Sequence, residues 1–326
     1  MNGDPLAVMK ARLSALKPEF EWNPENANWS ESARSALIEA IGVVDQPWPE
    51  PSLECGQPIE EDGYRRLRVE FPSHLGWSGR GWLLIPDGLD ARVPAVVCVP
   101  GHGVGVDAIV GLVEEPYQSN FAIQSVKQGW VVLAIEQVSF GTNKSSRDAD
   151  KYSSCVTDSM AALLLGETVT GWRVRDAIAS VRALATHPLV DPDRTGIMGI
   201  SGGGLTALWA AALEPKFLAT GVSGYFCPMA HSILNVDHCP DNYVPGFGTM
   251  MDVPDLAGLV APRWLAVENG TEDPIFEAAG FLSGCELATR IYLHHDVPER
   301  FSSDLFEGDH VFHGTALIAH FKQAFA

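Results

Sequence analysis

The sequence has little positive charge and lacks any long apolar run. Its 326 residues include 22 Lys and Arg against 41 Asp and Glu, which gives a formal net charge of −19. A surface of this sign repels phosphate backbones and anionic headgroups, so it argues against a nucleic-acid partner and against a basic membrane-binding patch. No apolar run reaches the roughly 18 residues that a membrane-spanning helix needs. The first residues lack the basic and apolar parts of a secretory signal, so we expect a cytoplasmic protein.

The cysteines also lack the spacing of a disulfide framework or a zinc ribbon. The six are scattered without a Cys-x-x-Cys pair: Cys55, Cys98, Cys155, Cys227, Cys239 and Cys285. This spacing favours reduced thiols. Metal-ligating residue types do occur near one another, at Asp309, His310 and His313, at His294-His295 and at His238-Cys239. Because no zinc-enzyme pattern such as His-Glu-x-x-His links them, the sequence predicts no catalytic metal.

The composition is that of a globular chain, with 46% apolar and 19% charged residues. Residues 1–60 are expected to form an N-terminal helical extension and a linker. Helical spacing covers residues 6–16 and 30–41, with Ser30 as the N-cap, and four prolines follow within residues 45–58. Residues 61–326 are expected to form the main domain. It begins with two antiparallel strands at 64–71 and 81–85, joined by a turn at Ser78-Gly79.

The main domain then alternates short apolar segments with helical ones. Strands are predicted at residues 95–99, 130–135, 196–200, 218–222, 264–267 and 290–293, and helices at 119–128, 156–185, 202–213 and 315–325. The charged face of the helix around Trp172, Arg173 and Arg175 is expected to be solvated or to serve packing. This alternation predicts an α/β fold with a mostly parallel central sheet and helices on both faces. Ligands of such sheets bind at the carboxyl ends of the strands.

A Gly-x-Ser-x-Gly motif lies between a predicted strand and a predicted helix, at residues 199–203. A nucleophilic serine has to project from a tight turn, where flanking side chains would clash with the neighbouring strand and helix. Ser201 is therefore the candidate nucleophile, and the N–H of Gly202 can bind a developing oxyanion at the helix N-terminus. The alternative is that the small residues only let the helix pack closely on the strand.

A second glycine-rich loop follows the strand at residues 95–99, with Gly101, His102, Gly103 and Gly105. It is the expected position of a second backbone donor to the oxyanion, and His102 is a candidate through its N–H rather than as an acid or base. A dinucleotide-binding loop is the rival interpretation. The glycines fit only part of Gly-x-Gly-x-x-Gly, and the next acidic strand end comes too late in the sequence.

Candidates for the acid and the base follow the later strands. Asp273 lies on the loop after residues 264–267, with Glu268 in reserve, and His310 or His313 precedes the last helix. We favour Asp273 and His310, and we expect Glu268 to bind N–H groups of its own turn. The order Ser, Asp, His is that of the α/β-hydrolases.

Taken together, these residues resemble the α/β-hydrolase superfamily, and within it serine esterases similar to dienelactone hydrolase and acetyl xylan esterase. The matching segments include VVCVPGHG at 96–103, GWVVLAIE at 129–136, GETVTGWRVRD at 166–176, ENGTEDPIF at 268–276 and FEGDHVF at 306–312. The resemblance implies Ser201, Asp273 and His310 as the triad, with the N–H groups of His102 and Gly202 as the oxyanion hole. Pro100 stands where many relatives have histidine, so Gly103 is an alternative to His102.

The sequence thus predicts a serine carboxylesterase that acts on a small-molecule ester and needs no cofactor. Dienelactone hydrolase itself uses a cysteine nucleophile, so Ser201 points to ordinary carboxylic esters. Residues 224–259 are a candidate lid and acyl pocket, with apolar residues Tyr225, Phe226, Met229, Tyr243, Phe247, Met250 and Met251. Two alternatives stay open: a peptidase or amidase of the same fold, and a non-catalytic protein that kept the fold.

Overall fold

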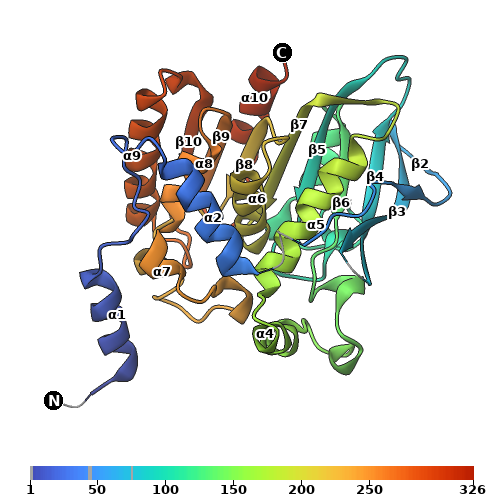
Figure 1. The fold of residues 1–326 in the computed structure, drawn as a ribbon. Coiled ribbons are helices and arrows are strands. Elements are labelled where there is room, and N and C mark those ends of the chain that lie inside the picture. Colours follow the sequence, from blue (N-terminus) through green and yellow to red (C-terminus); the bar gives the residue numbers. More distant parts are fainter. Residues whose placement is uncertain (1–2, 43–45, 75) are drawn as a thin grey trace.

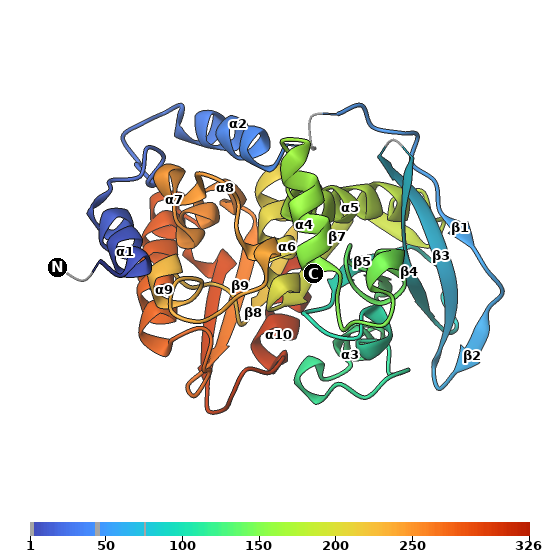
Figure 2. The same ribbon diagram turned by 90° about the horizontal axis from the view of Figure 1, so that it is seen from below.

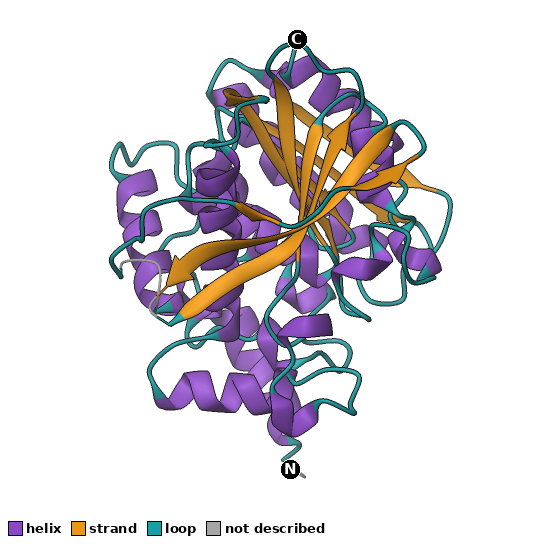
Figure 3. Ribbon diagram, turned by 90° about the vertical axis from the view of Figure 1, so that its right-hand side faces the viewer, coloured by secondary structure: helices purple, strands orange, loops and turns teal. Residues whose placement is uncertain are grey.

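A computed structural model describes residues 3–42, 46–74 and 76–326 of the chain. They form a ten-stranded sheet in the order β1-β3-β4-β6-β5-β7-β8-β9-β10, with β2 paired to β3. The sheet is strongly twisted and lies between layers of helices (Figures 1 and 3). The predicted α/β architecture is therefore confirmed. Among the described residues, no helix is long and apolar enough to cross a membrane.

The leading strands are antiparallel, as predicted. They are β1 (Glu54–Cys55), β2 (Ile59–Glu61), β3 (Tyr64–His74) and β4 (Trp77–Pro86). The predicted turn at Ser78-Gly79 is wrong, because both residues lie within β4 and Gly79 pairs with Phe71. The ring of Phe71 occupies the space that a side chain at residue 79 would need, which explains the glycine there. Asp45, in the predicted proline-rich linker, lies outside the described residues.

The parallel strands bring their carboxyl ends to one edge. They are β5 (Val93–Val99), β6 (Val131–Ile135), β7 (Val190–Ile200), β8 (Ala219–Ser223), β9 (Trp264–Gly270) and β10 (Phe301–Phe306). Ile200 pairs with Ser223, which pairs in turn with Glu268. The loops after β7, β8 and β9 therefore begin at the same level of the sheet.

Helices cover both faces of the sheet (Figure 2), and an apolar core lies on each side of it. One face packs against α3 (Phe121–Val126) and α10 (Thr315–Ala324), and the other against α5 (Val169–Leu184), α6 (Gly202–Leu213), α8 (Ala257–Val260) and α9 (Ala278–His294). The strand predicted at residues 290–293 is wrong, because these residues end α9. The strand that completes the sheet is β10.

The long helix predicted over residues 156–185 is two helices. The first is α4 (Cys155–Leu164), and α5 follows after a break. Gly166 has a φ of +73°, which a helix does not tolerate. Thr168 then caps α5, because its hydroxyl accepts a hydrogen bond of 2.9 Å from the N–H of Gly171.

The N-terminal helices lie close to their predicted positions, as α1 (Pro5–Ala15) and α2 (Trp29–Ile41). The N-cap of α2 is Asn28 rather than Ser30. One side of α2 is buried at four-residue intervals, by Trp29, Ala33, Leu37 and Ile41. These side chains belong to the main core, so α2 covers the α6 and α8 layer. No residue of α1 is buried.

Candidate active site

Ser201 occupies a strained turn between β7 and α6. Its backbone has φ 55° and ψ −125°, a conformation that non-glycine residues rarely adopt. A side chain at Gly199 would overlap the backbone of Gly203, and one at Gly203 would overlap the backbone of Val99 and Pro100 at the end of β5. The close approach of the start of α6 to these strands therefore requires glycine at both positions. The N–H of Ser201 donates a hydrogen bond of 2.9 Å to the carbonyl of Ser223, which ties the turn to the end of β8. The strain fits a serine that must project from the sheet.

His310 and Asp273 meet beside the same strand end. The Nδ1 atom of His310 lies 2.7 Å from Oδ2 of Asp273. The other Asp273 oxygen accepts hydrogen bonds from the N–H groups of Ile275 and Phe276, at 2.8 and 3.0 Å. The Asp273 side chain is 1% exposed and that of His310 is 11% exposed. Asp273 is thus a fixed, acceptor-only partner for His310.

The orientation of the His310 ring places its other nitrogen inside the molecule. Nε2 of His310 is buried and, within the part of the chain that the structure describes, has no hydrogen-bond partner. The ring stacks between Tyr117 and Phe276, with centroid distances of 5.8 and 5.7 Å. Gly224, which directly follows β8, leaves room for it, because a Cβ there would lie 2.8 Å from Cε1 of His310. Ser201 and His310 therefore both flank the end of β8.

Glu268 and His313 lie elsewhere and make different contacts. Glu268 is fully buried, and its carboxylate accepts hydrogen bonds of 3.0 Å from the N–H groups of His313 and Gly314. The expectation that Glu268 binds its own turn is therefore wrong. Burial raises the pKa of Glu268 to about 7. The His313 ring is partly exposed and lies 3.3 Å from Asp304. Glu268 anchors the loop that carries His310, and it does not contact the His310 ring.

The glycine-rich loop after β5 presents free backbone donors. Side chains accept three of its N–H groups: Gln118 binds that of Gly101, Glu115 that of Val104 and Glu136 that of Val106. The carbonyl of His102 accepts a hydrogen bond from the Tyr117 hydroxyl. Among the described residues, the N–H groups of His102, Gly103 and Gly202 have no acceptor. The structure thus leaves both His102 and Gly103 available as the second oxyanion donor.

The His102 ring points behind this loop, where the sequence indicated no partner. Its Nε2 lies 3.0 and 3.1 Å from the two oxygens of Asp241, and its edge lies against Gly202. Arg173 forms an ion pair with Asp241 and donates hydrogen bonds to the carbonyl of Val138 at 3.0 and 2.8 Å. Burial alone would lower the pKa of His102, but the charge of Asp241 raises it to about 9.

Around Arg173 and Arg175, the charged face of α5 is buried and serves packing, which is one of the two expected outcomes. Arg173 is 2% exposed and Arg175 is fully buried. Arg175 donates hydrogen bonds of 3.0 and 2.7 Å to the carbonyls of Gln46 and Pro47. Burial alone would raise the pKa of Asp241, but the charges of Arg173 and His102 hold it well below its ordinary value. The sequence signal that indicates this burial is the position of Arg173 and Arg175 among the apolar residues of one helix.

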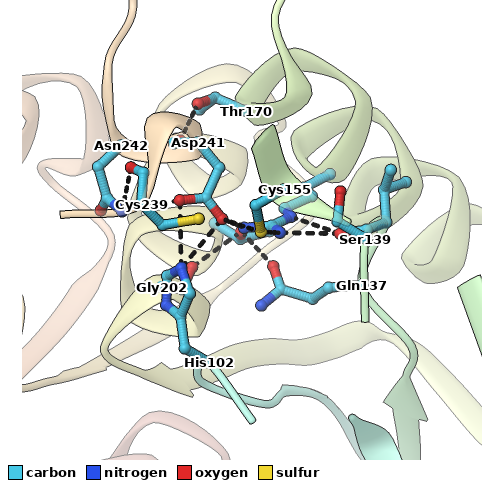
Figure 4. A network of polar contacts seen from close by, with 12 residues as sticks. His102, Gln137, Ser139, Cys155, Thr170, Gly202, Cys239, Asp241 and Asn242 are labelled. Atoms are coloured by element: carbon cyan, nitrogen blue, oxygen red, sulfur yellow. Dashed lines mark hydrogen bonds and ion pairs between the residues drawn. The ribbon is translucent and has the colours of Figure 1, made fainter. Parts of the chain in front are cut away.

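Two groups of side chains in the described structure have the donor types of a metal site. One is His102 with Cys155, Cys239 and Asp241, and the other is Glu268 with Asp304 and His313. In the second group, Glu268 already accepts the backbone hydrogen bonds of the loop before α10. The first group lies directly behind the loop after β5 (Figure 4).

The predicted lid, residues 224–259, is largely packed into the protein. Phe226, Phe247 and Met251 are buried in the main core. Met229 and Met251 line a cavity of about 580 Å³ together with residues of the N-terminal extension such as Trp22. Neither Ser201 nor His310 lines that cavity. Two of the apolar side chains that we expected to form an acyl pocket, Met229 and Met251, therefore face the N-terminal extension, whereas Tyr225 packs against Phe276. The lid role stays a prediction.

Comparison with known proteins places the chain in a family. The model of the Abhydrolase family matches residues 5–304. YtaP of Bacillus subtilis (strain 168), provisionally named a hydrolase, is 26% identical over 231 residues, which are 68% of this chain and 73% of that protein.

Solved structures agree with this family in fold. A Bacteroides fragilis NCTC 9343 protein, provisionally named an acetyl xylan esterase, superposes with a TM-score of 0.77 at 19% identity, over 92% of this chain and 81% of that chain. A glucuronoyl esterase from Solibacter usitatus has a TM-score of 0.67 at 15% identity, over 91% of each chain. At these identities the similarity shows the fold.

Proposed function

The chain belongs to the Abhydrolase family, and we propose on that premise that it is a serine esterase acting on carboxylic esters. Ser201 is the nucleophile, His310 the general base and Asp273 the triad acid. The observation that carries the proposal is the 2.7 Å contact of His310 with Asp273 beside the strained turn of Ser201. A buried carboxylate that holds Nδ1 leaves Nε2 as the proton acceptor, which a serine nucleophile requires.

In the proposed reaction, Nε2 of His310 takes the hydroxyl proton of Ser201 while Oγ attacks the ester carbonyl. The carbonyl oxygen becomes an oxyanion and is bound by the N–H of Gly202 and that of His102 or Gly103. His310 then returns the proton to the leaving alcohol, and an acyl-serine remains. A water molecule, deprotonated by His310, releases the acid and restores Ser201.

The proposed substrates are esters with a small acyl group. Ser201 is 9% exposed, and two of the apolar residues that could have received a long acyl chain, Met229 and Met251, line a cavity elsewhere. The names of the two structural neighbours refer to esters of carbohydrates, one with acetyl and one with glucuronoyl groups. Acetylated sugars are therefore the first natural substrates to test.

The test combines a covalent probe with a substrate panel. A fluorophosphonate probe should label the wild-type chain at Ser201, as mapped by peptide mass spectrometry, and it should not label Ser201→Ala. Hydrolysis of p-nitrophenyl esters should fall from acetyl to palmitoyl, and acetylated xylose should be deacetylated. An unlabelled, inactive wild-type protein would contradict the proposal and favour a non-catalytic protein. Labelling with peptide cleavage and without ester turnover would favour an amidase.

A further inference from the structure

Four potential metal ligands from three separate segments converge behind the loop after β5. His102 comes from that loop, Cys155 is the first residue of α4, and Cys239 and Asp241 flank Pro240 in the segment after β8. One ligand atom of each residue lies within 4.8 Å of all the others. Sγ of Cys155 and Nε2 of His102 lie 3.3 and 3.0 Å from Oδ2 of Asp241 (Figure 4).

We propose that these four side chains form a structural zinc site. Two thiolates, one imidazole nitrogen and one carboxylate are the donors that Zn²⁺ prefers, and four protein ligands are typical of a structural site. A disulfide between the two cysteines would be the other use of the thiols. It would require neither the imidazole nor the carboxylate, and both of these converge on the same point.

The surroundings of the cluster supply the contacts that orient metal ligands. Arg173 pairs with Asp241 and lies 3.5 Å from Sγ of Cys155 through Nη2. The side chain of Asn242 donates a hydrogen bond of 2.8 Å to Oδ1 of Asp241, and Thr170 Oγ1 donates one of 2.6 Å to its carbonyl. Outer contacts of this kind hold ligating groups in place.

The charges of the cluster also suit a divalent cation. Two cysteine thiolates and the Asp241 carboxylate carry three negative charges when they bind a metal. The metal and the buried guanidinium of Arg173 together carry three positive charges, so the buried group is neutral overall. A metal would displace the protons of both thiols and of His102 Nε2, so binding should release protons and weaken at low pH.

The site would join three parts of the chain at one point. It would link the loop that carries the free N–H groups of His102 and Gly103 to α4 and to the segment that contains Cys239. The His102 ring lies against Gly202, so the metal would hold the glycine-rich loop after β5 against the start of α6. These ligands act by positioning, and none of them is assigned a step in the proposed hydrolysis. The proposal does not depend on esterase activity.

The test is metal analysis of the full chain, purified under reducing conditions without a chelator or a polyhistidine tag. We expect about one zinc per chain by elemental mass spectrometry. After removal of the metal, added Co²⁺ should produce the near-ultraviolet absorption of thiolate-to-cobalt charge transfer. Cys239→Ser and Cys155→Ser should lose the metal and that absorption. Cys55→Ser, which changes an exposed thiol elsewhere, should keep both.

Removal of the metal should lower the melting temperature of the wild-type protein and leave that of folded Cys239→Ser unchanged. If Cys239→Ser does not fold, Cys239→Ala and the Co²⁺ spectrum of the wild-type protein carry the test. The proposal is overturned if the wild-type chain holds less than roughly one tenth of an equivalent of metal both as purified and after titration. It is also overturned if Cys239→Ser binds as well as the wild type, or if peptide mapping shows a Cys155–Cys239 disulfide in the active protein.

Discussion

Replacing Asp273 by asparagine tests the proposed triad at its most sharply defined contact. The substitution keeps the size of the side chain, and the amide oxygen can still accept the hydrogen bonds from Ile275 and Phe276. The amide nitrogen then faces Nδ1 of His310 in place of Oδ2 at 2.7 Å. Because an NH₂ group can only donate there, Nδ1 has to become the acceptor. The ring proton moves to Nε2, and His310 can no longer take a proton from Ser201.

The magnitude follows from this change of tautomer. In serine proteases, the corresponding asparagine lowers kcat by about 10⁴. At about 1.36 kcal/mol per factor of ten, this corresponds to roughly 5.4 kcal/mol of lost transition-state stabilisation. We expect kcat for p-nitrophenyl acetate to fall by three to four orders of magnitude, with the melting temperature nearly unchanged, because the two backbone hydrogen bonds remain.

The matched control is Glu268→Gln, the same chemical change five residues earlier on the chain. Glu268 contacts backbone N–H groups of the His310 loop and not its ring. The Glu268→Gln variant should lose less than tenfold in kcat, and any larger loss should be accompanied by a lower melting temperature. Measured kcat and melting curves of both variants decide between the two carboxylates. The reverse ranking would refute the assignment of Asp273 and make Glu268 the acid.

Four further outcomes are expected. Ser201→Ala should keep the fold and lose at least roughly a thousandfold in kcat; near wild-type turnover would exclude the serine mechanism. His310→Ala should lower kcat as much as Ser201→Ala, and the two losses should not add in the double variant. His313→Ala should have a mild effect, because the His313 ring is partly exposed and lies beside Asp304. An inactive His313→Ala would make His313 the general base. Gly224→Ala should lower kcat, because a Cβ there would lie 2.8 Å from the His310 ring at a residue with φ +55°; unchanged kinetics would mean that the ring is held elsewhere. The folded pKa of Glu268, about 7, lies above its unfolded value, so its charged form opposes folding. Its contribution to the free energy of unfolding should therefore fall as pH rises from about 4.5 to 7, and Glu268→Gln should remove that part of the pH dependence in urea titrations. If the free energy of unfolding has the same slope against pH in both proteins, the buried carboxylate is contradicted.

The placement of Ser201, Asp273 and His310 near one sheet edge could be predicted from the sequence. Each residue follows a recognisable strand or precedes a recognisable helix, and parallel strands bring such positions to one edge. The register confirms this for β7, β9 and β10, whose following loops carry the three residues. The catalytic roles of the three residues stay predictions that the variants above can test.

The identity of the last strand could not be predicted from local pattern. Residues 290–293 are a short apolar run that fits a strand as well as a helix. In the structure they end α9, and Tyr292 continues its buried face after Phe281, Cys285 and Ala288. The spacing of these four residues, four, three and four, is that of an α-helix. The actual strand, β10, is only partly apolar, and its pairing with β9 defines it.

The polar contacts of His102, Asp241, Arg173 and Cys155 could not be predicted from the sequence, because these residues are distant in it. Arg173 and Asp241 are separated by 68 positions, and Cys155 and Asp241 by 86. Spacing rules find metal ligands only where two or more lie on one turn or loop. Cys239 and Asp241 are close, but they match no known pattern by themselves. Only the packing of α4 and α5 beneath the segment after β8 brings the four ligands together.

The carboxylates of Glu268, within β9, and Asp273, after it, differ in role because they differ in what surrounds them. Glu268 is still paired within the sheet, opposite Ser223, and its fully buried side chain accepts hydrogen bonds from the N–H groups of the loop before α10. Asp273 lies beyond the strand, in a turn where one of its oxygens accepts hydrogen bonds from the N–H groups of Ile275 and Phe276. The other oxygen is left for the ring of His310. One carboxylate therefore fixes the backbone of the histidine loop and the other fixes the histidine side chain, and removing either should disturb a different property.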